Sequence, residues 1–156
     1  MVGESRLMAF YRGGRDDRGR RLEDVLGWDH HQLELVHDYI QWMFPLTERS
    51  MAQPSAPVLS ADDVRMFRQD PALQQRMREA LAVMLAFYGL EPPGPRRWLE
   101  FGNHNYLRLT RILRSLRLAG LEPEARRLFA ALSEIHELHP SVVGATTFRY
   151  WQGAMA

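Results

Sequence analysis

The sequence predicts a single all-α domain, an irregular bundle of about five to seven helices with a proline-rich crossing loop. Three observations support this prediction. The length of 156 residues is typical of one domain. Apolar residues recur at three- and four-residue spacing in several segments, and capping residues, glycines and prolines mark the ends of these segments. No segment shows the alternating pattern that is typical of a strand.

Composition and charge exclude several classes of protein. The chain has no cysteine, so neither a disulfide nor thiol chemistry is available. Its 20 basic residues are all arginine and face 19 acidic residues, and a net charge of +1 does not indicate a dedicated nucleic-acid binder. We interpret the exclusive use of arginine as the codon bias of a GC-rich bacterial genome. No apolar run is long enough for a transmembrane helix and no secretory leader is recognisable, so we expect a cytoplasmic protein.

The chain is expected to begin with an arginine- and glycine-rich segment, residues 1–21, that is loosely attached to a body formed by residues 22–156. Its anchors would be four apolar residues, Leu7, Met8, Phe10 and Tyr11.

Two helical segments are expected next. A short helical turn is expected at residues 22–26. Asp29 stands three residues before Gln32, which is the spacing of a capping box, so a helix is expected over residues 30–43 before Pro45 stops it.

The middle of the chain contains the crossing loop and two helices. Residues 44–59 hold three prolines and no periodicity, which predicts an extended crossing or a surface loop. Ser60 is the expected N-cap of a short helix. Asp70 followed by Pro71 is expected to begin a longer helix, which Gly89 ends with a left-handed residue.

The last part of the chain is expected to contain three more helices. Prolines break regular structure in residues 90–97. Asn103 is a candidate N-cap for a helix over residues 104–119. Pro123 would begin another helix, and Ser141 would cap the last one.

Three segments resemble, in this order, the conserved region of the opioid growth factor receptor family, also called the zeta-type opioid receptor. They are YIQWMFPL at residues 39–46, MLAFYG at residues 84–89 and HNYLRLTRILRSL at residues 104–116. The resemblance extends over nearly the whole chain. It implies a receptor for the pentapeptide met-enkephalin that regulates cell growth, in a family unrelated to seven-helix opioid receptors. We expect this chain to be a bacterial member that consists of the domain alone.

We expect a ligand-binding site where residues 39–46 meet the helix over residues 104–119. An aromatic-lined pocket closed by a few polar groups would suit a short peptide that contains tyrosine or phenylalanine. Pro45 and Trp98 would add to the apolar material, and core packing is the alternative role for these aromatic residues. The candidate ligand-binding residues are Tyr39, Gln41, Trp42, Phe44, Tyr88, His104, Asn105, Arg108 and Arg111.

A stripe of basic residues offers a different function. His104, Arg108, Arg111 and Ser115 share one face of their helix, and residues 96–118 hold six arginines against one acidic residue. Such a stripe could bind a small anion or a nucleic acid. Alternatively, it could pair with the acidic first half of the chain.

One arginine of this helix is expected to be partly buried. Arg111 or Arg114 would then need a polar partner, and Asp38 or Gln41 could supply it.

Catalysis has little support in the sequence. His30, Glu34 and His37 are weak candidates for metal ligands, at four- and three-residue spacing on one expected helix, and they suggest a metal-dependent hydrolase as a further alternative. No nucleophile elbow, P-loop or dinucleotide-binding turn occurs. We therefore expect a non-enzymatic module without a cofactor, which binds a short peptide, a small anionic ligand or another protein.

Overall fold

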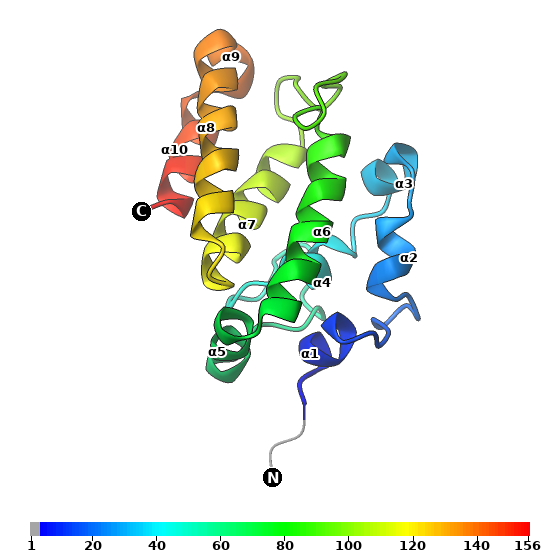
Figure 1. Ribbon diagram of the computed structural model, residues 1–156. Coiled ribbons are helices and arrows are strands. Elements are labelled where there is room, and N and C mark those ends of the chain that lie inside the picture. Colours follow the sequence, from blue (N-terminus) through cyan, green and yellow to red (C-terminus); the bar gives the residue numbers. More distant parts are fainter. Residues whose placement is uncertain (1–3) are drawn as a thin grey trace.

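The computed structural model describes residues 4–156 (Figure 1). It confirms the all-α prediction, with ten helices in the described residues rather than five to seven. In chain order they are α1 (Arg6–Tyr11), α2 (Leu22–Leu26), α3 (His30–Leu35), α4 (Ile40–Met43), α5 (Ala61–Gln69), α6 (Pro71–Phe87), α7 (Asn105–Leu118), α8 (Glu122–Leu138), α9 (Pro140–Val143) and α10 (Ala145–Ala154).

Helix α7 is the centre of the bundle. It packs against α8, α10 and α5, and Gln74 of α6 donates a hydrogen bond to the carbonyl of Ala119 at its end. In Figure 1 it lies between α6 and the group formed by α8, α9 and α10. The polar residues Asn105, Arg108 and Ser115 are buried along it together with its leucines and isoleucine. A helix with buried polar groups needs partners for them, and these partners come from the first half of the chain.

Local sequence signals set several helix ends as expected. Ser60 and Asp63 form a reciprocal capping box at α5, and Asp29 and Gln32 form another at α3. Asp70 caps α6 by accepting a hydrogen bond from the backbone N–H of Ala72. These ends depend only on residues a few positions apart, which is why the sequence predicts them.

Glycine and asparagine also act where the sequence places them. Gly89 ends α6 at φ 65°, and a Cβ there would lie 2.6 Å from the carbonyl oxygen of Gly94. Asn103 accepts a hydrogen bond from the backbone N–H of Asn105 at the start of α7, at 2.8 Å.

The expected helix over residues 30–43 is wrong, because the chain leaves the helix at Val36 and resumes at Ile40. Val36 has extended backbone angles, φ −87° and ψ 131°. Breaking a helix exposes carbonyls that would otherwise accept hydrogen bonds within it. Here a side chain of α7 binds two of these carbonyls, so the break is stabilised by tertiary contacts.

The last expected helix is also divided. Gly144, at φ 86°, separates α9 from α10, and Ser141 lies inside α9 instead of capping a longer helix. These breaks and the additional helix α1 explain why the number of helices exceeds the prediction.

Residues 7–11 of the N-terminal segment are part of the core, in contrast to the loose attachment that the sequence predicts. All four expected anchors are at most 1% exposed, namely Leu7, Met8, Phe10 and Tyr11. Asp16 is buried, accepts hydrogen bonds from two backbone N–H groups and pairs with Arg20, which also reaches Asp38. These contacts fix the turn before α2. Residues 1–3 of the expected segment lie outside the described residues.

The proline-rich crossing joins α4 to α5 and is anchored at both ends. Leu46 and Leu59 are buried, and the backbone N–H of Leu59 donates to the carbonyl of Leu46 at 2.8 Å. Met51, near the middle, is 94% exposed. The crossing loop is therefore confirmed. Over residues 4–156, no helix combines the length and apolar character that a membrane span requires.

Candidate functional site

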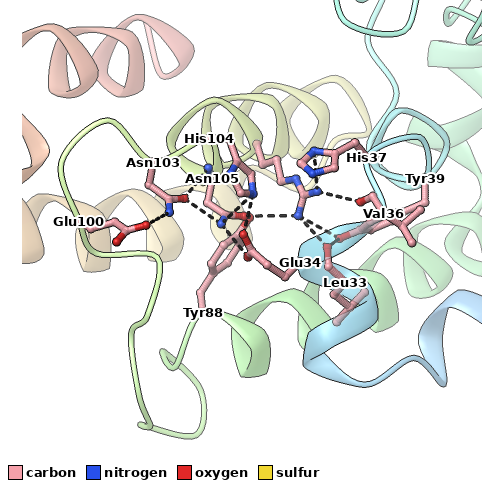
Figure 2. A network of polar contacts seen from close by, with 11 residues as sticks. Leu33, Glu34, Val36, His37, Tyr39, Tyr88, Glu100, Asn103, His104 and Asn105 are labelled. Atoms are coloured by element: carbon pink, nitrogen blue, oxygen red, sulfur yellow. Dashed lines mark hydrogen bonds and ion pairs between the residues drawn. The ribbon is translucent and has the colours of Figure 1, made fainter.

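Arg108 connects α7 to the break between α3 and α4. The guanidinium is buried and donates to the carbonyls of Leu33 and Val36, both at 2.8 Å, and to the hydroxyl of Tyr39 at 3.3 Å. The Tyr39 hydroxyl itself donates to Leu33 at 2.7 Å. Figure 2 shows Leu33, Val36 and Tyr39, the three partners of this guanidinium, close together at the break. The cation is thus matched by carbonyl dipoles rather than by a carboxylate.

Two other members of the basic stripe, Arg111 and Ser115, also bind backbone carbonyls. Arg111 donates to Phe44 at 3.1 Å, and Ser115 donates to Pro45 at 2.8 Å. Burial lowers the pKa of Arg111 to about 10. Because Arg108, Arg111 and Ser115 bind the backbone of the same protein, the stripe does not form the exposed anion-binding surface that the sequence suggested.

The expected partners of a buried arginine are also wrong. Asp38 pairs with Arg18 and Arg20, and Gln41 donates to the carbonyl of His37 at 3.3 Å. Among the arginines of α7, only Arg114 pairs with the described part of the acidic half, through Glu48. Carboxylates therefore have a smaller role than the charge pattern indicated.

The aromatic members of the expected site lie in the hydrophobic core. Their side chains are at most 2% exposed, and they are Tyr39, Trp42, Phe44 and Tyr88. Burial raises the pKa of the Tyr39 hydroxyl to about 12. Gln41 is 6% exposed and also lies inside the protein. The structure brings these residues and α7 together, but as a packed interface and not as the walls of a pocket.

His104 and Asn105 lie at the edge of this interface and bind Glu34 of α3. The Nε2 atom of His104 is 2.8 Å from one carboxylate oxygen of Glu34, and the amide of Asn105 donates to the other at 3.1 Å. The hydroxyl of Tyr88 contacts the amide oxygen of Asn105 at 3.3 Å. Figure 2 shows Glu34 between these groups and the break that Arg108 holds. The network therefore fixes the position of a half-exposed carboxylate.

The three weak metal candidates do not form a site. Helix α3 ends at Leu35, so His37 does not continue the helical spacing from His30 and Glu34. His37 lies instead against the ring of His104, with ring centroids 4.9 Å apart. Within residues 4–156, no group of three or more metal-ligating side chains is close enough to hold an ion.

A cleft opens beside Glu34, between α3, the end of α6 and the loop before α7. Its volume is about 430 Å³. The apolar wall contains Phe87 and Trp98, and the indole N–H of Trp98 donates to the carbonyl of Tyr88 at 2.8 Å. The polar part of the lining consists of His30, His31, Glu34, Arg97, Glu100 and Asn103.

The charges of this cleft are mixed. Glu34 and Glu100 contribute two carboxylates and Arg97 one guanidinium. Asn103 donates to Glu100 at 2.9 Å, which holds that carboxylate on the loop. An aromatic surface beside groups of both signs can bind a small molecule that carries a positive and a negative group. The cleft is therefore the candidate functional site.

Comparison with known proteins is consistent with the resemblance of the three segments. Residues 19–93 match the family model described as the opioid growth factor receptor conserved region. The human opioid growth factor receptor is 36% identical over 139 residues, an alignment that covers 77% of this chain and 20% of the human protein. The chain belongs to the opioid growth factor receptor conserved-region family.

Further relatives of the family show the same partial coverage. The rat opioid growth factor receptor is 38% identical over 121 residues, which covers 67% of this chain and 21% of the rat protein. Opioid growth factor receptor-like protein 1 of Xenopus tropicalis is 33% identical over 143 residues, which covers 80% and 28%. The chain thus spans between a fifth and three tenths of these relatives. No solved structure matches it.

The cleft of this family member contains residues that the sequence did not indicate as ligand contacts. Trp98, Glu34 and His30 were proposed for other sites, and Arg97 belongs to the basic stretch over residues 96–118. Phe87 and Glu100 were not proposed as ligand contacts. The loop after α6 begins directly after the family segment at residues 84–89, and functional residues are often carried by loops held on a rigid scaffold. The position of this loop, directly after a family segment, could therefore have indicated a ligand contact.

Proposed function

We propose that this chain is a non-enzymatic module that binds a short peptide in the cleft between α3 and the loop before α7. The observation that carries the proposal is an aromatic wall, Phe87 and Trp98, beside two carboxylates and one guanidinium. The name of the human and rat relatives, opioid growth factor receptor, supports a peptide as the ligand.

The chemistry of the cleft suggests how a short peptide would bind. A free α-ammonium group would lie between Glu34 and Glu100, because both carboxylates accept hydrogen bonds. An aromatic side chain would pack on Phe87, which is partly exposed, whereas Trp98 is 3% exposed and supports this wall from inside. A carboxylate of the peptide would approach Arg97. The volume of about 430 Å³ is within the usual range of small-ligand sites and suits part of a pentapeptide.

His104 and Asn105 are positioning residues in this proposal. They hold the two oxygens of Glu34 before any ligand arrives, at 2.8 and 3.1 Å. A preformed acceptor reduces the ordering cost of binding. The buried residues Tyr39, Tyr88 and Arg108 support the position of α3 from behind. We assign no catalytic step and no cofactor to the cleft, and we propose that the protein acts in the cytoplasm.

Isothermal titration calorimetry with the whole chain tests this proposal. The probes are met-enkephalin and the same peptide acetylated at its amino terminus. Removing the ammonium should weaken binding by about tenfold or more, since a charge-assisted hydrogen bond is lost. Glu34→Gln should weaken binding of the free peptide similarly, and acetylation should then have little further effect.

Glu137→Gln is the matched control, because Glu137 is exposed on α8 and outside the cleft. It should leave the affinity unchanged. The proposal would be overturned if neither the free nor the acetylated peptide binds. Equal affinities of the Glu34→Gln and Glu137→Gln proteins would show that the peptide binds elsewhere.

A further inference from the structure

A second concave surface lies between α6 and α8, away from the cleft. It is a groove of about 210 Å³. Leu81, Leu128 and Ile135 are buried at its base, whereas Leu138 at one end is 65% exposed. In Figure 1, α6 and α8 run in the same direction, from the base of the view upwards. Helix α6 packs on α2 and α5, and α8 packs on α7, α9 and α10. The groove between α6 and α8 therefore has a buried base, and its accessible apolar surface includes Leu85, Ala131 and Leu138.

The apolar residues of the two walls follow the spacing of helix packing surfaces. On α8, Leu128, Ala131, Ile135 and Leu138 line the groove at intervals of three, four and three residues. On α6, Leu81 and Leu85 are four residues apart. Two stripes of this kind can accept the ridge of a third helix. The stretch of α8 from Glu124 to Leu138 is about 21 Å long at ~1.5 Å per residue, or about four turns.

The rim of the groove on α8 carries two carboxylates, Glu124 and Glu134, which are not fully paired with cations. Glu134 has no ion pair within residues 4–156. One oxygen of Glu124 is 3.4 Å from the Nε atom of Arg78. Its other oxygen is shielded from solvent and has no hydrogen-bond partner in the described part of the chain. The exposed Glu134 is therefore open to a cationic neighbour, and Glu124 adds negative charge to the same rim.

The arginines of the lining do not neutralise this rim. Arg127 is paired with Glu91 at 2.9 Å, and both side chains are more than half exposed. Arg96 contacts the carbonyl of Gly89 beyond the end of α6. The lining as a whole has three carboxylates and two guanidiniums. Charge complementarity therefore favours a basic occupant.

We propose that the groove between α6 and α8 docks an amphipathic helix of another protein. The apolar face of that helix carries leucine-like side chains at three- and four-residue spacing. Lysines or arginines flank this face and lie beside Glu124 and Glu134. The proposal concerns a protein-interaction surface and does not depend on peptide binding in the cleft beside Glu34.

Fluorescence anisotropy with the full chain tests the docking surface. The probe is a labelled synthetic helix of about 16 residues with leucines at the 3-4-3 spacing and flanking lysines. A second peptide has glutamates in place of the lysines, and a third has the same composition in scrambled order. We expect saturable binding of the first peptide below about 1 mM and no binding of the other two.

Variants of α8 locate the contact. Glu134→Lys should weaken binding about three- to tenfold, because it replaces attraction by repulsion at the rim. Glu137→Lys makes the same charge change on the same helix outside the groove and should change affinity less than twofold. Leu138→Ser should weaken binding, whereas Leu107→Ser, at a similarly exposed leucine of α7, should not.

Several outcomes would overturn this proposal. They are no binding of the basic helix, equal binding of the scrambled or acidic peptide, or equal effects of Glu134→Lys and Glu137→Lys. Sedimentation velocity of the chain without peptide tests one further outcome that would overturn it. If the chain dimerises and Leu138→Ser abolishes the dimer, the occupant is a second copy of this chain.

Discussion

Replacing Arg108 with methionine tests whether this side chain holds the break between α3 and α4. Methionine keeps much of the apolar volume but cannot donate hydrogen bonds. In the Arg108→Met protein, the carbonyl of Val36 loses its donor at 2.8 Å, and Leu33 keeps only the hydroxyl of Tyr39. The substitution therefore separates the hydrogen bonds of Arg108 from its packing.

The expected magnitude is the balance of two effects. Each hydrogen bond from a charged donor contributes about 1.5–3 kcal/mol, and two strong ones are lost. Removing a buried cation also removes its desolvation cost, which offsets part of the loss. We expect the free energy of unfolding to fall by about 2–4 kcal/mol, out of a total of about 5–15 kcal/mol for a domain. The protein should therefore still fold.

Urea denaturation followed by circular dichroism measures this loss. Arg114→Met on the same helix is the control, because Arg114 is more exposed and its pair with Glu48 lies at the surface. It should cost less than about 1 kcal/mol. A loss below about 1 kcal/mol for Arg108→Met, or equal losses for the two variants, would refute the role assigned to Arg108.

Two further predictions concern protonation and backbone conformation. The pKa of His37 is lowered, mainly by burial and then by the positive charges of Arg108 and His104. The unfolded chain therefore binds more protons, so stability should fall as the pH decreases from about 7 towards 5, and pH-dependent denaturation should show a smaller fall in His37→Gln. The exposed His139→Gln is the control, and an unchanged pH profile in both variants would contradict this prediction. Gly89→Ala should lower the free energy of unfolding by more than about 2 kcal/mol, because φ is 65° and the new Cβ would meet the carbonyl of Gly94. Thermal denaturation measures this loss. Gly153→Ala in α10 is the control and should be neutral or slightly stabilising, because no atom lies within 4 Å of the added Cβ. Equal melting temperatures for the two alanine variants would exclude strain at Gly89.

The candidate site was only partly predictable from the sequence. The sequence indicated that residues 39–46 meet α7 and that Arg111 or Arg114 is partly buried there. Phe44 and Pro45 do contact α7, and Arg111 is partly buried. The predicted partner was Asp38 or Gln41, whereas Arg111 binds the carbonyl of Phe44.

The sequence did not predict that Arg108 is buried or that it binds the carbonyls of Leu33 and Val36. These two carbonyls are available because the helix breaks, and the residue pattern over 30–43 shows no breaker at Val36.

The sequence by itself determined the helical class, the family and the helix ends capped by Ser60, Asp70 and Gly89, because caps and turns depend on residues a few positions apart. The tertiary structure decided which polar residues are buried, where the helix after Asp29 breaks, and where the cleft lies. The contact between Arg108 and Leu33 joins residues 75 positions apart, and the cleft brings α3 against the loop before α7. Such contacts form only when distant segments pack together, and no local pattern encodes them.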